Sequence, residues 1–171
     1  MRGPWPPLPC VLLSVAYLEQ YMRALLASFF IEGSTAENLL NHKGALGSFG
    51  AQTDLCYSLG LIPKLIFNNL AVIGEIRNVF AHSIMPLTFE SPEVTELING
   101  RDKKPGLQIP ERYYQKSGSA TTILTNAAPQ NNRVKFQAAV VIAINVLVNS
   151  PWPARRSEYE GFRFVMADDK E

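Results

Sequence analysis

The segment from Pro63 to about Ser83 constrains the fold most, because its apolar residues recur at helical spacing along its whole length. The apolar stripe consists of Ile66, Leu70, Ile73 and Phe80. Proline at position 63 suits the first residue of a helix, where no N–H group is needed. Such a helix is about 30 Å long, enough to cross a small domain. Arg77 falls on the same stripe, so its guanidinium group requires a partner.

Helical periodicity recurs elsewhere, most clearly at residues 10–31 and 133–149. Shorter helices are predicted from Ser34, which opens a capping-box pattern, from a Ser48 N-cap and from Ser91 followed by Pro92. We therefore predict an all-α fold: a helical bundle of about four long helices plus short helices and one long loop. The predicted divisions are an irregular N-terminal segment at 1–9, a single helical domain at 10–150 and a C-terminal tail at 151–171.

The composition is typical of one globular domain: 171 residues, 47% hydrophobic, 18% charged, with a net charge of +1. A net charge this close to zero argues against strong non-specific electrostatic binding to DNA. Two cysteines outside any CxxC pair and two histidines offer no metal site, and we expect no cofactor. A reduced, cytoplasmic protein is the simplest interpretation. Glu19 and Arg23 interrupt the apolar run that starts at Val11, so no membrane span is predicted.

From Arg101 to Asn132 the composition shifts to lysine, glycine, proline, serine and threonine, which predicts a long loop with at most a brief hairpin around 120–124. Its basic residues form a weak candidate nucleic-acid site, which Tyr113 and Tyr114 could complete by stacking on bases. These basic residues are Arg101, Lys103, Lys104, Arg112 and Lys116. A solvated loop is the simpler alternative.

Asp54 offers a partner for Arg77, because the two residues lie on helices joined by a short connection. We expect a structural pair of Asp54 with a mostly buried Arg77, and a catalytic role for either residue is the alternative. The glycines at 44, 47 and 50 precede the helix that carries Asp54. Their spacing matches no phosphate-binding motif, and a plain turn with a helix cap is the preferred interpretation.

A more specific hypothesis, of a catalytic site, concerns Arg77, Asn78 and His82. Asn78 and His82 are four residues apart and share a helix face, whereas Arg77 and His82 diverge. A two-fold axis could bring the arginine of one chain beside the histidine of another, and that pair suits RNA cleavage by proton transfer and phosphate stabilisation. The alternative is a polar helix end, with His82 placed favourably for the helix dipole.

Three blocks resemble the mannitol operon repressor family of bacteria: residues 44–62 (GALGSFGAQTDLCYSLGLI), 76–83 (IRNVFAHS) and 89–94 (FESPEV). The resemblance covers roughly residues 10–150. It implies an all-helical transcriptional repressor of sugar-alcohol uptake without a recognisable DNA-binding motif. The expected partners are therefore another protein and a second copy of the chain, with nucleic acid contacted indirectly and no membrane.

The hexad from Arg77 to His82 also looks like the signature of the HEPN superfamily of helical bundles. Many members of that superfamily are metal-independent dimeric ribonucleases. By this resemblance Arg77, Asn78 and His82 would be the catalytic residues.

Overall fold

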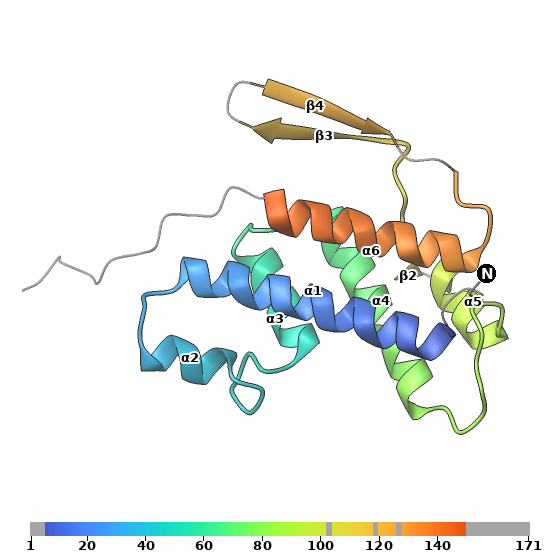
Figure 1. The fold of residues 1–171 in the computed structure, drawn as a ribbon, viewed down its shortest axis with the longest axis horizontal. Helices are drawn as coiled ribbons and strands as arrows, with labels where there is room; N and C mark the ends of the chain where they lie inside the picture. The colour runs from blue at the N-terminus through green and yellow to red at the C-terminus, as the bar shows by residue number, and fades with distance from the viewer. Residues whose placement is uncertain (1–5, 102–103, 118–119, 126–127, 150–171) are drawn as a thin grey trace, which may run out of the picture.

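The structure is a computed structural model, and it describes residues 6–101, 104–117, 120–125 and 128–149. It is mostly helical, which confirms the predicted all-α fold (Figure 1). The three long helices have 23, 19 and 18 residues, one fewer than the predicted number of about four. The helices are α1 (Pro7–Phe29), α2 (Ser34–Leu40), α3 (Phe49–Ser58), α4 (Lys64–His82), α5 (Pro92–Asn99) and α6 (Asn132–Asn149).

The core lies between α1, α4 and α6, each of which packs against the other two, while α3 and α5 flank α4 (Figure 1). Ile66, Leu70 and Ile73 of the helical stripe on α4 are fully buried, and a series of aromatic rings joins α4 to α6 through the segment before α5. The ring of Phe89 lies 5.7 Å from that of Phe80 and 5.3 Å from that of Phe136. The third sequence block, at 89–94, therefore contributes to the core through Phe89 and Val94.

Helix α1 begins at Pro7, inside the segment that was predicted to be irregular. The prediction was wrong at this end because proline is tolerated in the first turn, where the N–H groups have no partners within the helix. By length and composition α1 is also apolar enough to cross a membrane, but six of its side chains are buried in the bundle. The expectation of no membrane span stays a prediction.

The structure confirms the predicted cap at Ser48 but not the one at Ser34. Ser48 is the N-cap of α3, and its hydroxyl oxygen accepts a hydrogen bond from the Ala51 N–H at 3.2 Å. Helix α2 is instead preceded by Gly33, which has φ of +154° and no side chain, and Ser34 lies inside the helix. The capping-box prediction at Ser34 was therefore wrong, because glycine provides the backbone conformation of this N-cap without a side-chain bond.

The segment predicted as one long loop contains short antiparallel pairs of strands. Strands β1 (Gly100–Arg101) and β2 (Lys104–Pro105) form a small ribbon directly after α5. Strands β3 (Arg112–Ser117) and β4 (Ala120–Thr125) form a hairpin whose register pairs Arg112 with Thr125 (Figure 1). The brief hairpin expected at 120–124 is therefore longer, because this stretch is rich in tyrosine, threonine and isoleucine, which favour strands.

A side-chain clamp fixes the segment after β2 to helix α4. Asn69 is fully buried, and its amide group donates to the Gln108 carbonyl at 2.9 Å and accepts from the Gln108 N–H at 2.8 Å. The clamp therefore joins residues that are 39 positions apart in the sequence. The predicted tail at 151–171 lies outside the described residues.

Candidate functional site

The largest described cavity lies between α1, α3 and α4 and has a volume of about 620 Å³. We call it the α4 pocket. Its size is within the range of ligand sites, which often lie between the helices of a bundle. Its polar lining residues are Glu19, Ser48, Thr53, Asp54, Glu75, Arg77 and Asn78, and its apolar ones include Val15, Phe49, Leu70 and Ala71.

Glycines shape the walls of the α4 pocket. A Cβ atom on Gly74 would lie 3.3 Å from Cδ1 of Phe49, so glycine in the middle of α4 lets α3 approach closely. A Cβ on Gly47 would collide with the carbonyl of His42, whereas one on Gly50 would meet nothing within 4 Å. A side chain is therefore excluded at Gly47, whereas a side chain at Gly50, which lines the pocket, would meet open space.

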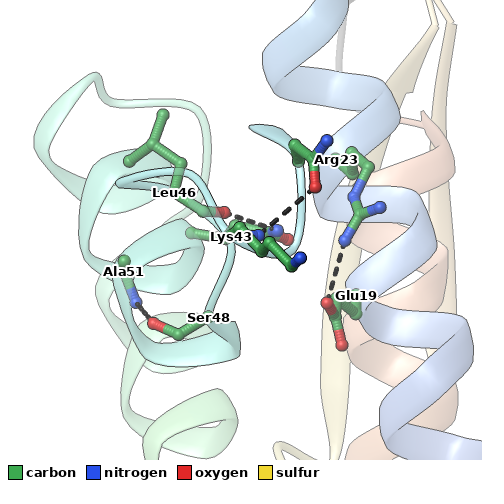
Figure 2. A network of polar contacts seen from close by, with 8 residues as sticks. Glu19, Arg23, Lys43, Leu46, Ser48 and Ala51 are labelled. Atoms are coloured by element: carbon green, nitrogen blue, oxygen red, sulfur yellow. Dashed lines mark hydrogen bonds and ion pairs between the residues drawn. The ribbon is translucent and has the colours of Figure 1, made fainter. Parts of the chain in front are cut away.

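The wall formed by α1 carries an ion pair, in which Arg23 Nη2 lies 3.0 Å from Glu19 Oε1 (Figure 2). Across from it, the Gln52 side chain donates through Nε2 to the Leu46 carbonyl at 2.8 Å and so fastens the turn before α3. Gln52 is fully buried. The ion pair therefore lies within α1, and the Gln52 bond fastens the turn to α3, so each contact orders its own side of the pocket.

The predicted buried pair of Asp54 and Arg77 is not formed. Asp54 is exposed and Arg77 is half-buried, and no ion pair within 4.0 Å joins them among the described residues. The reason is a register error of one residue. Ile76, which is fully buried, occupies the core position between Ile73 and Phe80, and Arg77 lies beside the stripe. Both charges instead line the α4 pocket, so the structure brings the two residues to the same cavity without joining them.

Arg77, Asn78 and His82 are all accessible to solvent at the end of α4. Arg77 donates through Nη1 to Asn78 Oδ1 at 2.9 Å, and both residues line the α4 pocket. His82 is exposed in the last turn and is not among the residues that line the pocket. One chain therefore keeps Arg77 and His82 apart, as expected, but Asn78 bonds to Arg77 although it was expected to share a face with His82.

In the part of the chain that the structure describes, two of the basic residues expected to contact nucleic acid are paired with carboxylates. Lys104 Nζ lies 3.0 Å from Glu75 Oε1, and Arg101 Nη1 lies 3.7 Å from Glu96 Oε2. Arg112 opens the separate β3–β4 hairpin, and Lys103 lies outside the described residues. The two paired cations have acidic neighbours that offset their charge, which weakens the case for a phosphate-binding loop. The side chain of Lys116 also lies outside the description.

Cys56 is fully buried, and burial raises the pKa of its thiol to about 12. A thiol that stays protonated near neutral pH is a poor nucleophile, so Cys56 is a small apolar residue of the core and not a catalytic group. Glu19, Gly74 and Glu75 line the α4 pocket but were not identified as site residues from the sequence. The only local signal was a glycine in the middle of a strong helix, which indicates close packing.

Comparison with models of known families, with curated proteins and with solved structures found no match to this chain. The resemblances to the mannitol operon repressor family and to the HEPN superfamily therefore stay predictions.

Proposed function

We propose that this protein is a cytoplasmic regulator of transcription that acts by binding a partner protein in the α4 pocket. The proposal rests on the positions of the three sequence blocks that carry the resemblance to the repressor family. Residues 47–50, 53 and 54 come from the first block, Arg77 and Asn78 come from the second, and all of them line the same cavity. The third block lies in the core and supports α4 through the contact of Phe89 with Phe80.

The lining of the pocket suits a segment of protein. It combines an apolar floor with carboxylates at Glu19, Asp54 and Glu75 and a guanidinium at Arg77, so it offers both apolar contact and charged rim groups. Asp54 and Arg77 form no ion pair with another described residue, so their charges are available to side chains of opposite sign. Direct reading of an operator has less support, because two of the candidate basic residues are already paired with carboxylates.

The test is regulation in the organism that encodes the chain. Transcripts of sugar-alcohol uptake genes should rise when the gene is deleted and should fall again on complementation with the wild type. Gly50→Phe should fail to complement, because it fills the pocket from a position with free space around its Cβ. Ser58→Phe, on the exposed end of the same helix, is the matched control and should complement. Unchanged transcripts after deletion, or full complementation by Gly50→Phe, would refute the proposal.

Metal-independent RNA cleavage is the second candidate function, and it is supported by the solvent access of the half-buried Arg77 and of the exposed Asn78 and His82. An arginine oriented by Asn78 can bind a phosphate, and an exposed imidazole can move a proton. Incubation with RNA in the presence of a chelator should then give 2′,3′-cyclic phosphate ends. His82→Ala should abolish them, while His42→Ala, which changes the other exposed histidine, should not. Wild-type protein that leaves RNA intact would eliminate this candidate.

A further inference from the structure

A groove runs between α1 and α6, which lie side by side and point in the same direction (Figure 1). Its volume is about 450 Å³, which is within the range of ligand sites. Residues of both helices line it, and none of them lines the α4 pocket. The groove is therefore a second candidate site, separate from the one that carries the proposed function.

One end of the groove is polar. It is lined by Arg133 and Gln137, which are four residues apart on α6 and so share a face of that helix. Cζ of Arg133 lies 5.7 Å from the centre of the buried Phe89 ring, a contact that holds the guanidinium group at this end. The Gln137 amide donates through Nε2 to Cys10 Sγ at 3.9 Å, and a thiol sulfur is a weak acceptor that an anionic oxygen can replace. Both side chains can therefore donate N–H groups to an anion.

The rest of the groove is apolar. It is lined by Leu13 and Tyr17 on α1 and by Val140 and Ile144 on α6. Leu13 is 45% exposed and Tyr17 is 56% exposed, so both present large apolar surfaces to solvent. From Arg133 to Ile144 helix α6 rises by about 16 Å. A surface of this length suits an extended alkyl chain, which buries apolar area all along it.

The groove carries a single positive charge. Among the described residues that line it, Arg133 is the one that is charged. No aspartate, glutamate, lysine or arginine occurs from Pro7 to Leu18 or from Phe136 to Asn149, so the helix faces beside the apolar part are neutral. One cation at the end of an apolar surface is complementary to a ligand with one negative charge and an apolar body. A carboxylate fits this cation well, because a guanidinium can bind it through two parallel hydrogen bonds.

We propose that the α1–α6 groove binds a fatty acid, an amphipathic carboxylate with a single alkyl chain. The carboxylate accepts hydrogen bonds from Arg133 and from the Gln137 amide, and the alkyl chain lies along the groove towards Tyr17 and Ile144. Binding removes the apolar surfaces of Leu13 and Tyr17 from water, which drives association. The inference goes beyond the proposed function, since it concerns a different site and holds whatever the α4 pocket binds.

A membrane surface is the competing occupant, because α1 is by length and composition also apolar enough to cross a membrane. Helices that lie on membranes are usually rich in lysine and arginine beside their apolar face. The described lining of the groove has one such residue, Arg133, at one end. A single cation in this position matches one carboxylate better than an array of lipid headgroups, so the charges favour the free fatty acid.

The test is isothermal titration calorimetry with dodecanoate, kept below the concentration at which it forms micelles. The wild type should bind dodecanoate about 10-fold or more tightly than dodecylammonium, which has an equally long alkyl chain and the opposite charge. Arg133→Gln should lower the affinity for dodecanoate by about 10–100-fold, because it removes a charge-assisted hydrogen bond. Lys135→Gln is the matched control: Lys135 is a half-buried cation of the same helix that does not line the groove, so the affinity should not change.

The apolar part of the groove has its own variant. Leu13→Glu puts a carboxylate against the alkyl chain and should lower the affinity by about 10-fold or more. Leu12→Glu is the matched control, because Leu12 is the adjacent residue, is 41% exposed and does not line the groove, so this variant should bind like the wild type. Circular dichroism identifies any variant that fails to fold, and Gln137→Ala then replaces Arg133→Gln.

Cys10 reports where the ligand binds, because its half-buried thiol lines the groove. Dodecanoate should slow the reaction of Cys10 with a thiol reagent in the wild type, and much less in Leu13→Glu. An unchanged reaction rate in the wild type would overturn the proposal, since the ligand would then bind elsewhere.

Three results in the titrations would also overturn the proposal: no binding of dodecanoate, equal binding of dodecylammonium, or equal affinities of Arg133→Gln and Lys135→Gln. Flotation with vesicles of phosphatidylcholine and phosphatidylglycerol separates the two sources of an anionic amphiphile. If the wild type floats, Leu13→Glu does not, and free dodecanoate leaves Cys10 unprotected, the groove belongs to a membrane-binding surface and the proposal is wrong.

Discussion

Removal of the Asn69 clamp should destabilise the protein measurably. Asn69→Ala removes two hydrogen bonds to Gln108, of 2.8 and 2.9 Å, and leaves a small void where a fully buried amide had been. A typical internal hydrogen bond contributes about 1 kcal/mol. Gln108 is itself exposed, so its backbone groups can bind water once released, which limits the penalty for leaving them unpaired. The expected loss in the free energy of unfolding is therefore about 2–3 kcal/mol.

Two measurements test this value. For a chain of this size each kcal/mol lowers Tm by about 2–4 °C, so Asn69→Ala should lower it by about 4–12 °C. Asn68→Ala is the matched control, because Asn68 is half-buried on the same helix and takes no part in the clamp, so its effect should stay within about 0.5 kcal/mol. Hydrogen exchange is specific to the bond, and the Gln108 amide should be protected in the wild type and exchange rapidly in Asn69→Ala.

The reasoning fails if the two variants melt at the same temperature. It also fails if exchange at Gln108 is unchanged in Asn69→Ala, because the amide would then owe its protection to something other than the clamp.

Further predictions concern single side chains. Burial raises the pKa of Cys56 from 9.0 to about 12, so the thiol of the unfolded chain ionises at a lower pH than that of the folded protein. The free energy of unfolding should therefore be constant below pH 9 and should fall above pH 9 by up to about 1.4 kcal/mol per pH unit. In chemical denaturation, Cys56→Ala should have a correspondingly smaller loss between pH 8 and pH 10. Asp54→Ala should leave Tm nearly unchanged, because Asp54 is exposed and forms no ion pair with Arg77. A fall of several degrees would instead indicate that Asp54 and Arg77 do form a buried pair. Gly74→Val should cost about 1–3 kcal/mol by pressing α4 against Phe49, whereas Gly74→Ala should cost less, because alanine favours the helix and its Cβ makes only one tight contact. Equal denaturation midpoints for the two variants would contradict the packing argument.

The helices could be predicted from the sequence because their apolar residues repeat with a period that only a helix satisfies. Helix α6 begins and ends within about one residue of the predicted range, and Ser48 is a cap as its position indicated. The error at Arg77 shows the limit of the method. Ile76 and Arg77 are both spaced correctly from Ile73, and the sequence alone does not decide which of them enters the core.

The α4 pocket could be predicted only in part. Arg77 and Asp54 were identified because a charged residue on an apolar stripe requires a partner, and Asn78 was identified from its place in the segment from Arg77 to His82. Glu19 comes from a helix that lies far away in the sequence, and its place in the pocket depends on how α1 crosses α3 and α4. Such crossings are set by the packing of many side chains, which no local pattern records.

The packing of α1 against α6 also affects how the chain folds during synthesis. Phe29 ends α1 and Asn132 begins α6, so 102 residues lie between these two packed helices. A ribosome adds about 5–20 residues per second, and α1 therefore waits for about 5–20 s before its neighbour is made. During that interval its core stripe and its outer face are both uncovered. A nascent chain in this condition is a natural substrate for a chaperone that shields apolar segments until α6 emerges.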